Sequence, residues 1–470
     1  MGLRGLALMV VVLGLMMLSV RRWYLALCGL VFLTTLNQHP SMPTSIGGIA
    51  GLNPWNALWL VIIICWANDR RQHPHPVPVP RWVVGLIGAY VVMVVVTGLM
   101  AVMDSSMLAR TTMAGRGTSG IIIDGIINPL KYLVVGILFF DGARDLQRVR
   151  QAMISAVASG MCYSFLLFKS MNTRVFTIDY EDARRMTDKL VGLFANDLGQ
   201  LFAVIVWAAV CMVPIFQRRW VKAAWLFSTA VMLPPFIALK SRAGFVAFSM
   251  IALVLGLLRY RSVLIAYPIM VAVTIAIVPS VRDRVMQGVR DEAVPDAGLD
   301  WNEVSAGRVT GVWPPIIEQI PKSPIWGHGR YGIARTPAYE KIQATERIVP
   351  GHPHNAYLEI LLDAGAIGLI ICMTGMVGII WASMSLMRVR QHRTISALGT
   401  VGLAAAVGLM TAGIAGASFF PTQSTMIYLV IWGTVLRVYF ERKAALQNAA
   451  VAAMPLPPPR RRVVTPVSGR

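Results

Sequence analysis

The sequence predicts an all-α membrane protein, a polytopic bundle of about 12 transmembrane helices with one large external loop. Of its 470 residues, 56% are hydrophobic and only 14% are charged, and the mean hydropathy is +0.62. Soluble domains carry about 25% charged residues, so these values indicate an integral membrane protein. Apolar runs of about 15–25 residues, the length of a spanning helix, recur from end to end. Their apolar–polar alternation is too weak for a membrane β-barrel.

The predicted helices follow from these apolar runs, and twelve crossings result if every run from residue 23 onward crosses once. Residues 1–20 lack a clear small-residue cleavage site and precede another apolar run, so we expect them to remain in the mature protein. Either they start outside the membrane or they form a half-inserted hairpin. The runs cover residues 3–20, 23–36, 55–67, 82–103, 121–140, 152–168, 193–216, 220–239, 244–258, 263–278, 357–387, 395–416 and 424–440.

The net charge of +21 is concentrated in short connectors between the apolar runs. On the topology above, all strongly basic connectors fall on one side, which the positive-inside rule assigns to the cytoplasm. This pattern indicates a protein oriented in a membrane and predicts no nucleic-acid partner. The C-terminal tail, with three arginines at 460–462 after three prolines, joins the same side. The basic connectors are 68–81, 141–151, 217–222, 259–261 and 387–393.

The remaining connectors then face outward, and residues 279–356 form much the longest of them. We expect this segment to be a small folded cap with short helices. The predicted organisation is transmembrane helices over 1–278, the cap over 279–356, further transmembrane helices over 357–440 and a cytoplasmic tail over 441–470. The five cysteines lie in apolar runs without metal-ligand spacing, so they predict no disulfide framework and no metal site.

Three polar features meet at the outer face on this topology: Ser241 with Arg242, Arg308, and the segment with His352 and His354. Arginine presents a planar fork of donors that matches phosphate oxygens, and it stays charged at any relevant pH. Histidine moves protons near neutral pH. Two arginines and a histidine around one cavity would suit a diphosphate leaving group beside a nucleophile that must lose a proton.

Each of these residues also has a simpler interpretation. Arg242 can be an interfacial snorkelling arginine, and Arg308 can be a solvated loop charge. His354 can cap the following helix together with Asn355, while His352, next to a proline, is expected to be structural.

Two ionisable residues lie inside an apolar run rather than at its end. Asp124 and Lys131 stand seven positions apart on one predicted helix face, where isolated charges are costly. We expect them to form an internal ion pair, with site residues as the alternative.

At this point the sequence resembles the O-antigen ligase and polymerase family. The resemblance covers mainly residues 185–370, and the order and spacing of its short motifs carry it. His354-Asn355, nine residues and Gly365-Ala366-Ile367-Gly368 fit the family's His-Asn-x9-Gly-x-x-Gly signature, and Ser241-Arg242-Ala243-Gly244 resembles its Ser-Arg-x-Gly turn. Gly307-Arg308, about fifty residues before the histidine, and residues 323–329 resemble its Gly-Arg and Pro-φ-x-Gly-x-Gly loop pattern. A weaker echo is residues 192–197, preceded by Arg184-Arg185.

The resemblance implies a GT-C-like, inverting and metal-independent glycosyltransferase without a cofactor. It implies an enzyme of the bacterial inner membrane that transfers an O-antigen glycan from undecaprenyl diphosphate to a sugar hydroxyl of lipid A–core at the periplasmic face. Carried onto this chain, His354 is the general base or acceptor-orienting group. Arg242 and Arg308 hold the diphosphate, with Arg184 and Arg185 as further donor-binding candidates. Asn355, His352 and Ser241 support the site.

Other functions stay open at the level of sequence. An O-antigen polymerase would use the same donor with a second lipid-linked glycan as acceptor, and a protein O-glycosyltransferase is a further variant. Basic residues of the cap mildly favour the phosphate-rich lipid A–core as acceptor; they are Arg282, Arg284, Arg290, Lys322, Arg330, Arg335, Lys341 and Arg347.

Two further alternatives differ in mechanism or class. The spacing of Asp179 and Glu181 is like that of carboxylates in a metal site, so a metal-dependent mechanism stays an alternative. We rank it below the interpretation that these residues belong to a solvated acidic loop. A transporter or flippase, from a different class, commonly shows inverted repeats and paired broken helices. Neither stands out in this sequence.

Overall fold

The computed structural model describes the chain outside residues 1–2, 38, 41, 44, 47–50, 76, 78, 109–116, 172–177, 179, 287–304, 306, 347–348, 417–418 and 453–470. Over this part of the chain the regular structure is helical and contains no strand. Among the described residues, eight helices are long and apolar enough to cross a membrane, and two further apolar helices are shorter, Arg242–Leu258 and Val263–Ile277. The prediction of an all-α polytopic membrane bundle is confirmed. The count of about 12 crossings stays a prediction.

The helices of the N-terminal part follow the apolar runs closely. They are α1 (Leu3–Leu33), α2 (Pro54–Gln72), α3 (Arg81–Met103), α4 (Ser105–Leu108), α5 (Gly117–Ile122), the π-helix η3 (Ile123–Ile127), α6 (Asn128–Gly142), α7 (Leu146–Met171), α8 (Tyr180–Val191), α9 (Ala195–Met212), α10 (Arg219–Val231), α11 (Leu233–Ala238), α12 (Arg242–Leu258) and α13 (Val263–Ile277). Short 3₁₀ turns follow α1 and α9, at Thr34–Leu36 and Val213–Ile215.

The C-terminal part contains the cap and three long helices. The cap has α14 (Pro279–Met286), the π-helix η6 (Arg308–Val312), α16 (Trp313–Ile317), the 3₁₀ turn η7 (Ile320–Lys322) and α17 (Ala338–Thr345). The long helices are α18 (Ala356–Met387), α19 (Arg393–Ala412) and α20 (Met426–Ala452). Helix α20 therefore continues beyond residue 440 into the segment that we assigned to the tail.

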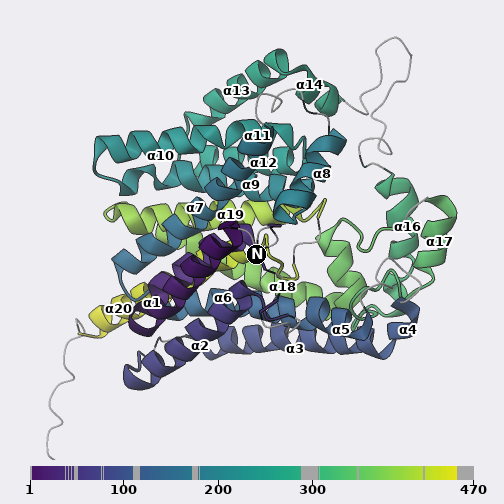
Figure 1. The fold of residues 1–470 in the computed structure, drawn as a ribbon, viewed down its shortest axis with the longest axis horizontal. Helices are drawn as coiled ribbons and strands as arrows, with labels where there is room; N and C mark the ends of the chain where they lie inside the picture. Colours follow the sequence, from purple (N-terminus) through teal and green to yellow (C-terminus); the bar gives the residue numbers. More distant parts are fainter. Residues whose placement is uncertain are drawn as a thin grey trace, which may run out of the picture.

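Helices α9 and α19 form the centre of the bundle, since their apolar windows are 83% and 78% buried inside the protein. They pack against each other and against α12, while α6 packs against α20 and α1 against α2 (Figure 1). The outer helices keep large apolar side chains exposed, for example Ile265 on α13 and Trp220 on α10. Lipid can cover such faces in a membrane.

The first helix is two helices that fold back on each other at Arg22, where the backbone leaves helical geometry (φ −143°, ψ 60°). A Cβ on Gly29 would meet the Leu15 side chain at 2.7 Å. In a straight helix these two residues would stand about 21 Å apart, at 1.5 Å per residue. Residues 3–21 thus form one continuous helix that runs back along the rest of α1, with Arg21 and Arg22 at the turn, and they do not fold on themselves as a half-inserted hairpin.

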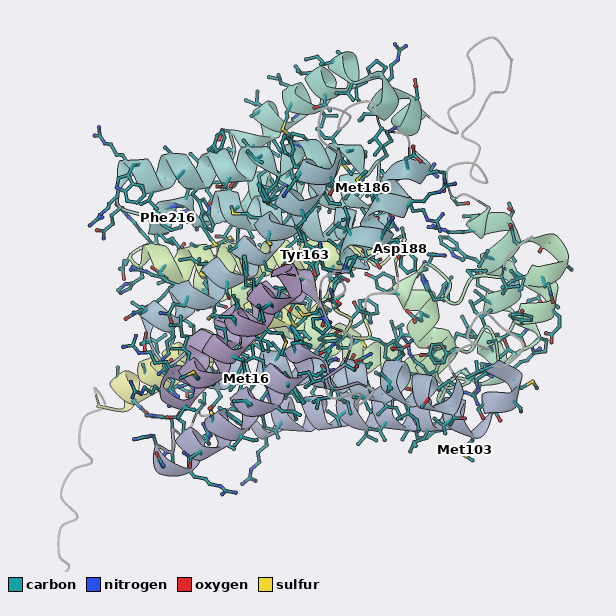
Figure 2. The ribbon with its side chains drawn as sticks, in the orientation of Figure 1. Met16, Met103, Tyr163, Met186, Asp188 and Phe216 are labelled. Carbon is teal, nitrogen blue, oxygen red and sulfur yellow. The ribbon has the colours of Figure 1, made fainter. Side chains whose placement is uncertain are left out.

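The basic connectors gather at one end of the bundle. The Arg259 guanidinium donates to the carbonyl of Met387 and to the Ser396 hydroxyl at 2.9 and 2.7 Å, which joins α12, α18 and α19. The Arg150 Nε donates to the Thr394 hydroxyl at 3.0 Å. Phe216, which precedes another basic connector, lies at this end in Figure 2, opposite Met103.

A second set of charges at the same end joins α2 to α6. The Asp141 carboxylate accepts from the Trp66 indole at 2.9 Å and pairs with Arg70. Arg144 bridges Asp69 and Asp141 at 3.0 and 3.4 Å. The charges that the topology argument placed on one side are thus tied together in space.

The expected ion pair between Asp124 and Lys131 is wrong, because none of the described ion pairs joins these residues. The Lys131 ammonium instead donates to the Asn56 side-chain oxygen at 3.3 Å and lies 5.0 Å from the Trp55 ring centre. Asp124 accepts from the Asn128 side chain at 3.0 Å. The π-helix η3, which lies between α5 and α6, contains Asp124.

The cap helices α16 and α17 lie at the other end of the bundle, where α16 contacts α18 (Figure 1). Tyr331 and Ala334 of the cap pack against Leu108 of α4 and Ile121 of α5. Its small core contains Val312, Ile316, Ile333 and Ile342 together with Leu362 of α18. The cap is thus packed on a transmembrane helix.

Helix α18 is broken at Gly365, and a loop of the cap fills the break. Gly365 adopts φ 64° and ψ −163°, a conformation that only glycine readily takes. The amides of Ala366 and Ile367, which begin the second half of the helix, donate to the carbonyls of Pro324 and Ile325 at 2.8 and 3.3 Å. The break therefore leaves no helix end without partners, which a membrane would penalise.

The first half of α18 is completed by the same loop. The amides of His328 and Gly329 donate to the carbonyls of Leu362 and Asp363 at 2.7 and 2.8 Å. The loop continues to α3, where the amide of Arg330 donates to the carbonyl of Thr97 at 2.9 Å. The two sequence motifs around residues 324–329 and at Gly365 are therefore two halves of one structural joint.

We expect Gly365→Ala to destabilise the fold, because a Cβ at this position would overlap the Ile325 carbonyl and would impose a strained backbone. The backbone strain alone costs about 1–3 kcal/mol. Thermal unfolding of the purified protein in detergent should show a clearly lower midpoint for this variant. Gly375→Ala is the control, because its Cβ would meet nothing within 4 Å on the same helix. Equal midpoints for the two variants would contradict the proposed joint.

Candidate functional site

His354 lies immediately before α18, at the end of the bundle that carries the cap. Its backbone has a left-handed φ of 54°, which is uncommon for a residue with a side chain. The helix is capped by the next residue, since the Asn355 side chain accepts the amides of Tyr357 and Leu358 at 3.0 and 3.1 Å. Among the described residues, none forms a hydrogen bond with the His354 imidazole. The capping role therefore belongs to Asn355, and the imidazole stays available.

His352 supports His354 directly. Its Nδ1 accepts the backbone amide of His354 at 3.2 Å, and the two ring centres lie 4.1 Å apart. An Nδ1 that accepts a hydrogen bond fixes the neutral ring with its proton on Nε2. The Trp313 indole donates to the carbonyl of Pro353, between the two histidines, at 3.0 Å. The cap thus holds the histidine segment against the start of α18.

The surroundings of His354 keep its imidazole neutral. Burial, together with smaller contributions from His352, Arg308 and Arg184, lowers the pKa of His354 to about 2. The pKa of His352 is also lowered, chiefly by burial, while the Glu359 carboxylate opposes that shift. The His354 ring is thus available as a proton acceptor around neutral pH, although burial and the neighbouring cations make it a weak base in the unliganded protein.

Arg308 stands at the start of η6, after Gly307, whose φ is 78°. The Glu346 carboxylate lies close to this turn, so that a Cβ on Gly307 would be 3.1 Å from its Oε1. Among the described arginines, Arg308 is the one whose charge acts on both His352 and His354. The structure therefore brings the Gly-Arg motif next to the histidine motif.

Arg242 lies at the same end of the bundle, at the first position of α12. The hydroxyl of the preceding Ser241 caps this helix, accepting the Gly244 amide at 3.1 Å, and donates to the Asn196 side chain at 2.6 Å. A Cβ on Gly244 would lie 2.8 Å from the backbone of Gly199, so the Ser-x-x-Gly spacing permits close packing of α12 on α9. The motif thus has a structural reason besides any role of Arg242.

A chain of hydrogen bonds relates this helix start to that of α18. The Asn196 amide group donates to the carbonyl of Ala415 at 3.1 Å, just beyond α19. Two residues earlier, the carbonyl of Gly413 accepts the amide of Ala356 at 2.7 Å. Arg242 and His354 therefore stand at two helix starts that α9 and the end of α19 connect.

Helix α8 brings a further arginine to this end. Arg184 acts on His354 and also pairs with Glu181 at 3.9 Å, with both side chains more than half exposed. Arg185 is exposed on the same helix and does not act on His354. In Figure 2, Asp188 marks α8 at the end of the bundle that faces the cap.

The acidic pair of Asp179 and Glu181 cannot be placed, because Asp179 lies outside the described residues. Within the part of the chain that the structure describes, no group of three or more histidines, cysteines and carboxylates is placed to hold a metal ion.

The structure also reveals a charged cluster that sequence reasoning missed. The Arg330 guanidinium pairs with Glu359 at 2.5 Å and with Asp363 at 3.0 Å, and all three side chains are at most 12% exposed. The guanidinium carbon lies 3.7 Å from the centre of the Phe420 ring. The available signal was the pair of carboxylates four residues apart in the first turns of an apolar run, where buried charge is costly.

This cluster corrects the interpretation that the basic residues of the cap favour a phosphate-rich acceptor. Arg330 was counted among the basic surface residues that favour a phosphate-rich acceptor, yet it is buried and neutralised. Arg335 pairs with Asp104, and Lys341 pairs with Glu318. These three charges are already offset within the protein, and they no longer support the choice of acceptor. The side chains of Arg284, Arg290 and Arg347 lie outside the described residues.

Residues 227–373 match the family model described as O-antigen ligase. The match contains Ser241, Arg242, Arg308 and both histidines. It supports assigning the chain to the O-antigen ligase family. A search of curated proteins found no match to the chain. The family implies a glycosyltransferase-like enzyme of O-antigen processing that uses lipid-linked glycans in a bacterial membrane.

Loss of the helix cap should separate the structural role of Asn355 from any catalytic role of its neighbour. We expect Asn355→Ala to lower the free energy of unfolding by about 1 kcal/mol, since two amides of the first turn lose their acceptor. Asn355→Ser should retain most of that stability, because serine caps helices almost as well. Denaturant titration in detergent would measure both. An alanine variant as stable as the serine variant would contradict the capping role.

Proposed function

We propose that the chain transfers an O-antigen glycan from undecaprenyl diphosphate to a sugar hydroxyl of lipid A–core, at the periplasmic face of the bacterial inner membrane. The proposal rests mainly on His354, a neutral histidine at the polar end of a membrane bundle. The positive charges of Arg308 and Arg184 act on this histidine. The opposite end holds the basic connectors, which the positive-inside rule assigns to the cytoplasm. The O-antigen ligase match supports the substrate class.

The transfer forms one bond and breaks another at the anomeric carbon of the glycan. The acceptor oxygen attacks that carbon while its proton passes to the imidazole of His354. The bond from the anomeric carbon to the diphosphate oxygen breaks, and the electron pair leaves with the diphosphate. Arg308 and Arg242 bind the departing diphosphate and offset its growing negative charge, as fixed cations do in a site of low dielectric.

The donor itself makes His354 a better base. In the unliganded protein the charges of Arg308 and Arg184 help to depress the pKa of His354. A bound diphosphate brings negative charge beside the same arginines and opposes that depression. The imidazole thus stays neutral before the donor arrives and becomes more basic once the leaving group is in place. This order couples proton removal to donor binding.

His354→Ala should abolish glycan transfer without loss of the folded protein, because Asn355 and not His354 caps α18. Purified protein, undecaprenyl-diphosphate glycan and lipid A–core would be scored for capped lipopolysaccharide, with thermal unfolding as the control for folding. Near-normal transfer would remove His354 from the mechanism. Lengthened lipid-linked glycan in place of capped lipopolysaccharide would identify the polymerase alternative, and strict dependence on added magnesium would favour the metal-dependent route.

The diphosphate clamp predicts graded effects for the arginines. Arg308→Ala and Arg242→Ala should each weaken donor use by about 10-fold or more, the range expected on loss of a charge-assisted hydrogen bond of about 1.5–3 kcal/mol. Arg184→Ala should reduce donor affinity more than Arg185→Ala, which removes the same charge from the same helix. The measurement is the dependence of the transfer rate on donor concentration. Unchanged donor affinity in both Arg308→Ala and Arg242→Ala would exclude the clamp.

A further inference from the structure

We propose that Glu359 is a positioning residue that acts through its negative charge on the histidine pair of His352 and His354. Asp363, one turn further along the same helix, has a structural role. The inference rests on the function proposed above. It concerns a carboxylate outside the residues to which that mechanism assigns a role. Glu359 and Asp363 stand four residues apart, on one face of the first half of α18.

The two carboxylates share one arginine, so they resemble each other in burial and in their main partner. Arg330 pairs with Glu359 at 2.5 Å and with Asp363 at 3.0 Å, and the two acidic side chains are 6% and 3% exposed. One arginine cannot neutralise two carboxylates, so the cluster carries a net negative charge if both are ionised. A buried net charge of this kind acts strongly on any titratable group nearby.

Glu359 and Asp363 differ in what else they contact. The Asp363 carboxylate accepts the Gly332 amide at 2.9 Å, and its carbonyl accepts that of Gly329, so it fixes the loop of the cap that fills the break in α18. Glu359 lies one turn nearer the helix start, about 6 Å closer to the histidines at 1.5 Å per residue. It makes the ion pair with Arg330, and its charge acts on His352.

The charges around His352 oppose one another. Glu359 on its own helix raises the pKa of His352, whereas Arg330 of the cap loop and Arg308 of η6 lower it. His352 in turn acts on His354, through the ring contact of 4.1 Å and the hydrogen bond from the His354 amide. Glu359 is thus the negative group that offsets the surrounding arginines at the histidine pair.

The same balance limits how much positive charge the donor meets. Two carboxylates hold Arg330, and the described arginines whose charges act on His354 are Arg308 and Arg184. Removal of the negative charge at Glu359 makes the site more positive. The histidines then become weaker bases, while an anionic donor binds at least as well. A residue with only a structural role would not produce these two opposite effects.

The test compares Glu359→Gln with Asp363→Asn, which remove one charge each from the same ion-paired cluster and preserve side-chain shape. In Glu359→Gln, the acid limb of the transfer rate at saturating donor should move down by about one pH unit, because a nearby negative charge is lost. The maximal rate should fall several-fold while KM for the donor does not rise. Asp363→Asn should keep the acid limb of the wild type, and Glu359→Asp should restore most of it.

A stability control distinguishes a structural role of Glu359 from an effect on the pKa of the histidines. Thermal unfolding should show a loss of stability in both Glu359→Gln and Asp363→Asn, because each weakens the pairing of Arg330. Equal acid limbs in wild type and Glu359→Gln, or an equal shift in both variants, would overturn the proposal and leave Glu359 a structural residue.

A readout without transfer keeps the inference distinct from the proposed function. In the full-length protein labelled with ¹⁵N-histidine, the His352 signal, assigned with His352→Gln, should titrate at lower pH in Glu359→Gln than in the wild type. An unchanged titration would refute the tuning role even if transfer were impaired. The expected shift, found together with full activity of His354→Ala, would leave Glu359 as the tuning residue and would reject His354 as the base.

Discussion

The joint between the break in α18 and the loop at 324–329 is the constraint on which the site depends. A helix broken inside a membrane bundle exposes carbonyls at one end and amides at the other, and both must find partners. Here one loop supplies both, since the amides of His328 and Gly329 bind the first half and the carbonyls of Pro324 and Ile325 bind the second. The cap is thereby fixed to the helix that begins just after His354.

This joint explains why charged residues can lie in the first half of α18. Arg330 follows directly from the loop, and its position is set by the backbone contacts on either side of it. It can therefore meet Glu359 and Asp363 in a buried ion-paired cluster that would be costly without such geometry. The same half-helix begins with the Asn355 cap, so its short length is supported at both ends.

The arrangement also separates two kinds of positive charge. Arg330 and Arg335 are paired with carboxylates inside the protein, whereas Arg308 and Arg184, the latter paired with Glu181 at the surface, act on His354. A count of basic residues does not distinguish these groups, since the distinction comes from where each arginine lies in the fold. The choice of acceptor therefore depends on the assay of the transfer product, and the charges of the cap do not decide it.

The sequence by itself determined the membrane class, the helical fold and the place of the polar end, because apolar run length and connector charge report directly on the bilayer. It also singled out His354, Arg308 and Arg242 from motif spacing. Only the tertiary structure showed that the Asn355 side chain caps the N-terminus of α18, that Asp124 and Lys131 do not form an ion pair, and that Arg330 pairs with Glu359. These outcomes depend on contacts between residues distant in sequence or on a local π-helix, and hydropathy carries no information about either.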